Sequence, residues 1–404
     1  MEPRLTRRIL SLLLAAAPVC SWGQVQFGDD ATKDLDSCRV HEVRNLPGSH
    51  HFASDFIEAM DGDPSLRAKD RDVVWAVTAD LSSKVLPQDR ALYISKSSDG
   101  GKTWSQVARI DSRYFDADIG EGERNGLSVF PGGTEFVLTT QRGAFQIVPQ
   151  PGSTDAVVRS IPGPRVAQPD TTVTIPKKVG DPVTANVVRI TPDGKRLMVG
   201  YGYFDMNPQL LTYRKSADGS WVQDGRLPQL PTEMDLLSMQ FCANSLYVGT
   251  GDQAFHLKTH AKSWTMITGV GPDSAIQSIS TVGGPHLAAC WGVYNPTNAD
   301  SVLRVTHASF LLHRDEDEAG SNIRAFSVDV DPARPSHEIA TSLTGVYFSK
   351  DHGWHWLRLN DLPDGEFRSA RFNPEDGTVI VSGVEGTFLA NPFSPHCTAR
   401  LKTR

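Results

Sequence analysis

The stretch from Ser98 to Trp104, Ser-Asp-Gly-Gly-Lys-Thr-Trp, is the sequence feature that most constrains the fold of this chain. Apolar runs lead into it at Ala91–Ile94 and out of it at Val107–Ile110, a pattern that predicts the tight turn of a β-hairpin. The glycines permit positive φ, and Asp99 can accept hydrogen bonds from the backbone of its own turn. Trp104 then starts the return strand with a large ring to bury.

Related stretches recur along the chain and predict a repeat architecture. Ser216–Trp221 is a shortened copy, and Ser349–Trp356 is a copy with two altered positions. Thr259–Trp264 and Thr306–Phe310 share a looser pattern. The terminal aromatic residues at 264, 310 and 356 are 46 residues apart, close to the ~40 to 50 residues of a four-stranded propeller blade.

The composition favours strands over helices, because 34 glycines and 26 prolines interrupt the chain too often for long helices. We predict an all-β fold, a β-propeller of four-stranded blades in one domain spanning 24–404, with seven blades preferred and six or eight left open. The expected units are 72–111, 125–163, 183–227, 236–269, 276–312, 321–360 and 367–393. The last unit lacks an outer strand, which Arg39–Val43 could supply and so close the ring.

The hairpin pattern resembles the Asp-box, also called the bacterial neuraminidase repeat. The chain is thus similar to the propellers of sialidases, sortilin-type receptors, some glucanases and photosystem II stability and assembly factors. The residues that carry the resemblance are Ser98, Asp99, Gly101, Thr103 and Trp104, and then Ser349, Asp351, Gly353 and Trp356. The resemblance implies that the box lies on the blade periphery, away from any active site, and acts as a folding staple.

The amino-terminal segment predicts export. Arginines precede the apolar run Ile9–Val19, and Ser21 and Gly23 fit the small positions before a cut near Gln24, which makes residues 1–23 a signal peptide. The run is shorter than the ~20 residues of a membrane span, and no other apolar stretch is long enough. We expect a periplasmic or extracellular monomer. A lipoprotein anchor at Cys20 is the weaker alternative.

The net charge restricts the classes of partner, and the cysteines bear on disulfides and metal binding. The formal net charge of -7 becomes about -9 for the mature chain, which argues against nucleic acid and anionic membranes as partners. Cys38 and Cys397 lie near the two ends of the mature chain, so we predict a disulfide between them. Whether Cys242 and Cys290 also pair stays open. No cluster of cysteine and histidine has zinc-ligand spacing, so no metal site is expected.

One acidic stretch and two aromatic groups are the candidate functional residues. Paired carboxylates can perform glycoside hydrolysis, whereas a run of like charges is more often a solvated loop. The acidic candidates are Asp116, Asp118, Glu121 and Glu123, followed by Arg124 as a ligand-binding candidate. Calcium could bind such a loop, but the spacing matches no EF-hand, and no cofactor is expected.

Aromatic rings beside amide groups suit a sugar ring, although such rings also pack between blades. These candidates are Tyr201, Tyr203 and Asp205 in one group, and Trp291, Tyr294 and Asn295 in the other.

Known catalytic patterns are missing from the sequence. The segment Arg44–Pro47 is a poor match to the arginine motif of sialidases, and no serine-hydrolase elbow, zinc-protease motif or nucleotide fingerprint occurs. Two hypotheses follow. The first is a non-enzymatic binding or assembly module that holds a protein or glycan at a propeller face, and the second is a carbohydrate-active enzyme. The sequence leaves the choice and the ligand open.

Overall fold

The computed structural model describes most of the chain between residues 41 and 393. The described residues are 41–43, 57–61, 73–80, 89–115, 126–168, 177–191, 193–202, 208–242, 244–271, 274–290, 292–305, 325–359, 362–363, 365–373, 376–383 and 386–393. Within them, strands form seven four-stranded antiparallel sheets, and the 3-10 turn η2 (Ser112–Tyr114) follows the first sheet. The predicted all-β, seven-bladed propeller is confirmed.

Each blade takes its strands in chain order from the ring axis outward. The first blade contains β2 (Ile57–Asp61), β3 (Val74–Asp80), β4 (Ala91–Ser97) and β5 (Ser105–Asp111). The second contains β6 (Leu127–Val129), β7 (Phe136–Thr140), β8 (Gly143–Pro149) and β9 (Ala156–Ser160). The third contains β10 (Ala185–Ile190), β11 (Arg196–Tyr201), β12 (Gln209–Lys215) and β13 (Trp221–Arg226). The fourth contains β14 (Leu236–Cys242), β15 (Ser245–Thr250), β16 (Ala254–Lys258) and β17 (Thr265–Met266).

The remaining three blades follow the same plan. The fifth contains β18 (Ile276–Ser280), β19 (His286–Ala289), β20 (Gly292–Asn298) and β21 (Ser301–Arg304). The sixth contains β22 (Ala325–Val330), β23 (Glu338–Ser342), β24 (Gly345–Ser349) and β25 (Leu357–Arg358). The seventh contains β26 (Phe367–Phe372), β27 (Val379–Gly383) and β28 (Gly386–Ala390), with β1 (His41–Glu42) as its outer strand.

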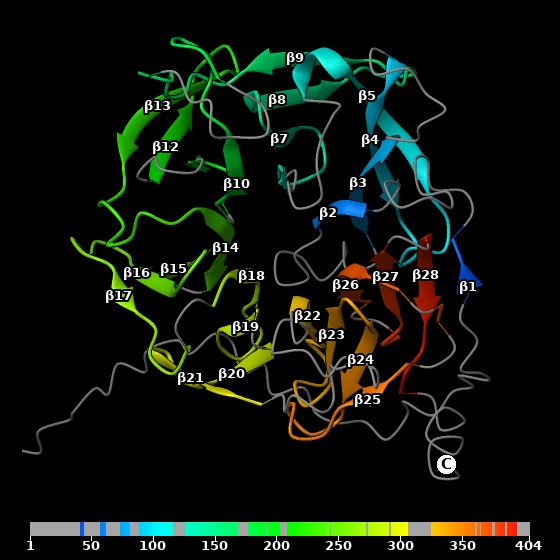
Figure 1. Cartoon of the computed structure of the whole chain (residues 1–404). Helices are drawn as coiled ribbons and strands as arrows, with labels where there is room; N and C mark the ends of the chain where they lie inside the picture. The colour runs from blue at the N-terminus through cyan, green and yellow to red at the C-terminus, as the bar shows by residue number, and fades with distance from the viewer. Residues whose placement is uncertain are drawn as a thin grey trace, which may run out of the picture.

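The inner strands make the ring continuous. Each of β2, β6, β10, β14, β18, β22 and β26 contacts the inner strand of the next blade, and β26 contacts β2. Figure 1 shows the seven sheets arranged around a common axis. Strand β1 pairs antiparallel with β28, so the outer strand of the last blade comes from the opposite end of the described chain. The first unit was predicted too short, because its inner strand begins at Ile57 and not near residue 72.

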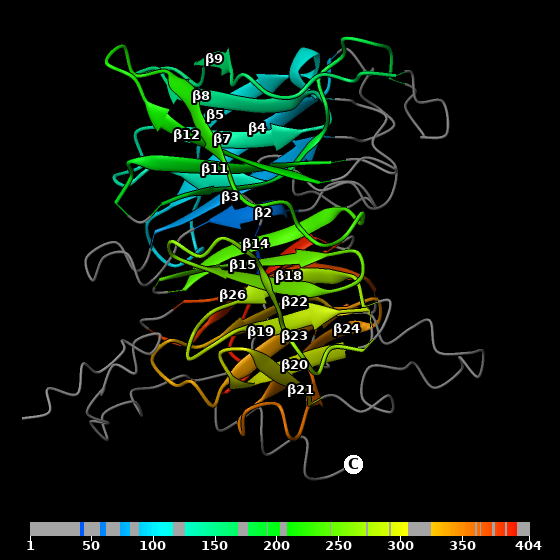
Figure 2. The same cartoon turned by 90° about the vertical axis from the view of Figure 1, so that its left-hand side faces the viewer.

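The up-and-down strand order gives the ring two different faces. Connections between blades and turns between second and third strands lie at one end of the strands, and we call this side the connection face. Turns between first and second strands and between third and fourth strands lie at the other end, and we call this side the hairpin face. Figure 2 views the stacked strands of the ring from the side. The hairpin Ser98–Trp104, between β4 and β5, belongs to the hairpin face.

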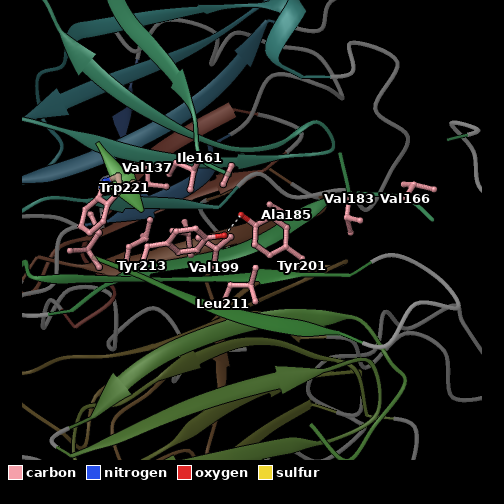
Figure 3. Packing of buried hydrophobic residues seen from close by; sticks show 14 residues of the cluster. Val137, Ile161, Val166, Val183, Ala185, Val199, Tyr201, Leu211, Tyr213 and Trp221 are labelled. Carbon is pink, nitrogen blue, oxygen red and sulfur yellow. Dashed lines mark hydrogen bonds between the residues drawn. The ribbon is translucent and has the colours of Figure 1, made fainter. Parts of the chain in front are cut away.

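Hydrophobic clusters fill the spaces between neighbouring blades. In Figure 3 the cluster between the second and third blades includes Val137 from β7 together with Tyr201, Tyr213 and Trp221 from the third blade. The hydroxyl groups of Tyr201 and Tyr213 lie 2.9 Å apart, and that of Tyr213 donates to the carbonyl oxygen of Pro162 at 2.7 Å. Large rings can therefore be buried here because each polar tip finds a partner.

Two hairpins share one hydrogen-bond pattern. In the first blade the amide of Gly101 donates to Ser97 Oγ at 2.8 Å, and Thr103 donates to Asp99 through its amide at 2.8 Å and its hydroxyl at 2.6 Å. Trp104 Nε1 donates to the carbonyl oxygen of Gly101 at 2.8 Å. Ser97 is buried, accepts from Gly101 and donates to Asp99 at 2.8 Å, whereas Ser98 is exposed.

The sixth-blade hairpin repeats the contacts of the serine and the aspartate, with a histidine in place of the threonine. The amide of Gly353 donates to Ser349 Oγ at 2.9 Å, and the amide of His355 donates to Asp351 at 2.9 Å. The His355 ring, at 2.5 Å from Asp351 Oδ2, takes the place of the threonine hydroxyl. Trp356 is 1% exposed and packs against the fifth blade.

The strand positions show that the 46-residue spacing of aromatic residues is not the length of a blade. Trp264 and Trp356 each directly precede an outer strand, but the equivalent turn of the fifth blade is Ala299–Asp300, between β20 and β21. Phe310 lies outside the described residues and after the end of that blade. The spacing therefore did not measure the blade length, because the blades differ in the lengths of their turns and connections.

Candidate functional site

The clearest candidate for a binding surface is the centre of the connection face, where a β-bulge recurs in six inner strands. Each bulge places one extra residue of the inner strand between two register pairs, and the bulge residues are Glu58, Asn186, Leu237, Gln277, Phe326 and Arg368. A bulge turns a side chain away from the regular pleat. Because every one is the second residue of its strand, all six lie at the same end of the ring.

These bulge residues present mixed chemistry. The Arg368 guanidinium lies 5.0 Å from the centre of the Phe326 ring and forms an ion pair with Glu366. Asn186 donates from its side-chain amide to the carbonyl oxygen of Gly202 at 3.0 Å. Leu237 and Gln277 are half-buried. The centre of this face therefore combines a cation, amides and apolar surface, contributed by different blades.

Basic side chains gather on the connection face around the second blade. They come from the connections on either side of that blade and from the turn between β7 and β8, and they are Arg113, Arg142, Arg165, Lys177 and Lys178. Arg142 donates to the carbonyl oxygen of Arg113 at 2.9 Å, and Lys177 donates to that of Pro182 at 3.0 Å. The Arg113 side chain is 70% exposed. We call these five residues the basic patch.

Deeper along the axis, a belt of polar residues joins neighbouring inner strands. Equivalent positions of successive inner strands carry Ser128, Arg189, Gln240, Ser280, Asp329 and Arg371. Arg189 donates to Gln240 at 2.9 Å, and Ser280 donates to Asp329 at 3.2 Å. Burial raises the pKa of Asp329, against the opposing effect of the Arg371 charge. These contacts run from blade to blade, so the belt stabilises the ring.

The hairpin face holds a second set of contacts between blades. A polar residue in the middle of a third strand reaches the hairpin turn of the next blade three times: Gln146 donates to the carbonyl oxygen of Gly219 at 2.8 Å, His256 Nε2 lies 2.8 Å from Asp300 Oδ1, and Asn295 donates to the carbonyl oxygen of His352 at 2.8 Å. The sequence analysis missed this role. Its signal in the second and fifth blades is a polar residue three positions after the start of the third strand, as in Gly143-Ala-Phe-Gln146 and Gly292-Val-Tyr-Asn295.

The described aromatic candidates are core residues, which corrects their predicted role as a sugar-binding surface. Tyr201 is 1% exposed and Tyr294 is 2% exposed, and both pack in clusters between blades. Burial raises the pKa of Tyr201 strongly, and that of Tyr213 to about 12. Asn295 is also buried, because its amide serves the fifth and sixth blades. Alternate aromatic residues on these strands therefore fill the space between sheets.

Other predicted residues lie outside the described part of the chain. These are the acidic candidates Asp116, Asp118, Glu121 and Glu123, the neighbouring Arg124, the candidates Tyr203, Asp205 and Trp291, and the cysteines Cys38 and Cys397. The predicted bridge between Cys38 and Cys397 stays a prediction. Cys290 is a free thiol, so it does not pair with Cys242.

Two further observations on the described residues concern metal binding and membrane-spanning helices. No group of three or more histidine, cysteine, aspartate or glutamate side chains is placed to hold a metal ion there. Among the helices of that same part of the chain, none is long and apolar enough to cross a membrane.

The fold defines the chain as a seven-bladed β-propeller with four-stranded antiparallel blades. No protein-family model matches the sequence, and no curated protein sequence matches it either. Solved structures do match. YCF48 from Cyanidioschyzon merolae is similar to it with a TM-score of 0.52 and 13% identity, over 87% of this chain and 98% of that chain.

A structure of YCF48 bound to a D1 peptide gives a TM-score of 0.52 and 11% identity, over 89% of this chain and 96% of that one. The extracellular domain of the hybrid two-component system BT4673 from B. thetaiotaomicron gives 0.53 and 12%, over 88% of this chain and 40% of that one. At these identities the similarity establishes the shared fold.

Proposed function

We propose that this protein is an exported Asp-box β-propeller that acts as a non-enzymatic binding or assembly module for a protein partner. The observation that carries the proposal is the connection face, where a bulge recurs in six inner strands and the bulge side chains of five blades bring mixed chemistry beside the basic patch. Loops and strand ends that converge on one face of a rigid ring are the usual place for recognition. The two similar hairpins are proposed to be Asp-box repeats that stabilise the ring.

A peptide partner fits this surface better than a sugar. Sugar rings stack on exposed aromatic faces, but Tyr201 and Tyr294, the described members of the predicted aromatic groups, are buried. The exposed side chains of the basic patch suit an extended segment with acidic residues. A solved propeller of similar fold, YCF48, is bound to a peptide. The proposed partner is therefore a protein with an acidic segment.

The test uses the mature protein, residues 24–404, and a displayed library of random peptides. Selected peptides are expected to be rich in aspartate and glutamate and to bind more weakly as salt increases. The double variant Arg113→Ala/Arg165→Ala should weaken binding at least about tenfold, since two charge contacts are lost. The matched control is Lys102→Ala/Lys195→Ala, which removes two exposed charges from the hairpin face and should leave binding unchanged.

The alternatives give different results. Selection of no acidic peptides, or equal losses in both double variants, would contradict the proposal. Hydrolysis of a glycoside panel that Glu121→Gln or Asp118→Asn abolishes in a folded protein would favour the carbohydrate-active enzyme, and binding on a glycan array alone would favour a glycan receptor.

A further inference from the structure

At two positions the sixth-blade hairpin carries a histidine where the first-blade hairpin carries a residue that does not titrate. His352 stands at φ 58 where the first blade has Gly100 at φ 69. His355 stands where the first blade has Thr103, and its ring contacts Asp351. A non-glycine residue in the left-handed region costs free energy, so the surrounding contacts have to hold this turn in place.

A buried polar cluster underneath supplies those contacts, and it joins two blades. Glu338 in β23 is fully buried, and its Oε1 accepts from the side-chain amide of Asn295 in β20 at 2.6 Å. The same amide donates to the carbonyl oxygen of His352 at 2.8 Å. Asn295 Oδ1 lies 2.9 Å from Nδ1 of His286, whose Nε2 lies 3.0 Å from the carbonyl oxygen of Val282. The cluster thus fastens the sixth-blade hairpin to the fifth blade.

The donors and acceptors of this cluster require one shared proton. His286 Nε2 faces a carbonyl oxygen and so carries a hydrogen, while Asn295 uses its amide hydrogens on Glu338 and His352 and turns its oxygen toward His286 Nδ1. That last contact is a hydrogen bond when the imidazole carries a second hydrogen, beside an ionised Glu338 3.7 Å away, whereas burial favours the proton on Glu338 and a neutral imidazole. The alternative neutral pair holds the same number of protons.

Burial sets the pH range over which the cluster retains that proton. It raises the pKa of Glu338 to about 8 and lowers the pKa of His286 to about 4. Other charges face the cluster from the elements around it. The Asp351 carboxylate adds to the rise at Glu338, and a charge on His352 would add to the fall at His286.

Further groups lie around the same hairpin. His337, beside Glu338 in the chain, has its pKa lowered to about 4 by burial and by the charges of Arg334 and Lys350. His355 contacts Asp351 on the exposed side of the hairpin. Glu338 Oε2 has no hydrogen-bond partner, so an added negative charge there would lack compensation.

We propose that the seam between the fifth and sixth blades is a proton-operated latch, in which the Glu338–Asn295–His286 cluster holds the hairpin Ser349–Trp356 closed while it retains one shared proton. In the open state the two groups titrate near their ordinary values of 4.5 and 6.5. Open and closed states then bind the same number of protons between those two values, so opening does not depend on pH there. Above 6.5 the open state binds fewer protons, and opening becomes easier up to about pH 8.

The linkage gives the size of the effect. Opening rises tenfold per pH unit across the interval from 6.5 to about 8, which is about 30-fold in total, and then levels off. The latch is independent of the proposed partner binding, because it lies on the opposite face of the ring. If the hairpin opened, the seam between the fifth and sixth blades would become accessible, and Trp354, which is already 56% exposed, would move with the hairpin.

The test is hydrogen exchange of the mature protein at pH values from about 5 to 9, read by mass spectrometry. The first-blade hairpin in the same molecule is the control, because it has Gly100 and Thr103 at the matching positions and reports the intrinsic rise of exchange with pH. After that correction, peptides from the sixth-blade hairpin should lose protection about 30-fold between pH 6.5 and 8. Glu338→Gln should abolish this extra loss, because its amide cannot release a proton.

Equal pH dependence in both hairpins, or an unchanged loss in Glu338→Gln, would overturn the latch. Infrared spectroscopy of the unmodified protein gives a second measurement that needs no variant. The buried carboxyl or its ion pair should change its absorption with a midpoint near pH 8. A spectrum in which neither the Glu338 carboxyl band nor the His286 imidazole band changes between pH 6 and 9 would also overturn the proposal.

Discussion

Replacing Gly101 by alanine tests how the first-blade hairpin closes the ring against the seventh blade. Gly101 has φ +93, and a Cβ added there would lie 2.5 Å from Ile380 Cδ1 and 2.7 Å from Ile380 Cγ1. Ile380 is 1% exposed and belongs to the seventh blade, so it has little room to move. The variant combines a positive-φ cost of roughly 1 to 2 kcal/mol with an overpacking cost of roughly 1 to 3 kcal/mol.

Gly132 supplies a matched control. Its φ is +95, almost the same as that of Gly101, but an added Cβ meets nothing within 4 Å. Gly132→Ala should therefore lose only the conformational part, about 1 to 2 kcal/mol, whereas Gly101→Ala should lose about 2 kcal/mol more. Denaturant unfolding of the two variants and the parent protein measures the difference. Equal losses in the two variants would refute the reasoning, because they would show that the contact with Ile380 does not resist the added methyl group.

Three further predictions concern hydrogen bonds and pH. Ser97→Ala should lower the free energy of unfolding by about 1 to 2 kcal/mol, because the buried amide of Gly101 loses its acceptor, and Ser98→Ala should change it by less than about 0.5 kcal/mol. Tyr213→Phe should cost about 1 to 2 kcal/mol in the same denaturant assay, since the Tyr201 hydroxyl loses its buried partner. The raised pKa of Glu338 contributes stability that is complete below pH 4.5 and is lost as the pH rises toward about 8. Because the contribution of the His286 imidazole is constant above pH 6.5, the free energy of unfolding should fall by about 2 kcal/mol from pH 6.5 to 8. A free energy of unfolding that stays constant over this interval would contradict the prediction.

The sequence predicted the architecture well where the pattern is local. Alternating apolar runs and the glycine-rich turn at Ser98–Trp104 are decided by neighbouring residues, and most predicted blade limits lie within a few residues of the strands. The inner strand of the first blade was missed because the separation between β2 and β3 is long. The spacing of Trp264, Phe310 and Trp356 misled for a related reason, since turn lengths vary between blades and Asp300, not an aromatic residue, directly precedes the outer strand of the fifth blade.

The candidate site was less accessible to sequence reasoning. The sequence left open whether Tyr201 and Tyr294 face a ligand or pack between blades, and only the packing of one sheet on the next shows that both are buried. The bulges at Asn186 and Arg368 depend on how the first and second strands pair. Nothing in the local sequence marks the extra residue, because the strand pairing that creates the bulge involves a second strand.

The sequence by itself determined that this chain forms strands, turns and repeated hairpins, because these depend on backbone freedom and on the period of apolar residues over a few positions. The hairpin that opens with Ser97 is the clearest product of such local chemistry. Only the tertiary structure decided which side chains meet across blades. Asn295, Glu338 and His286 are far apart in the chain, and their common proton exists because the ring brings the fifth and sixth blades into contact and removes the water between them.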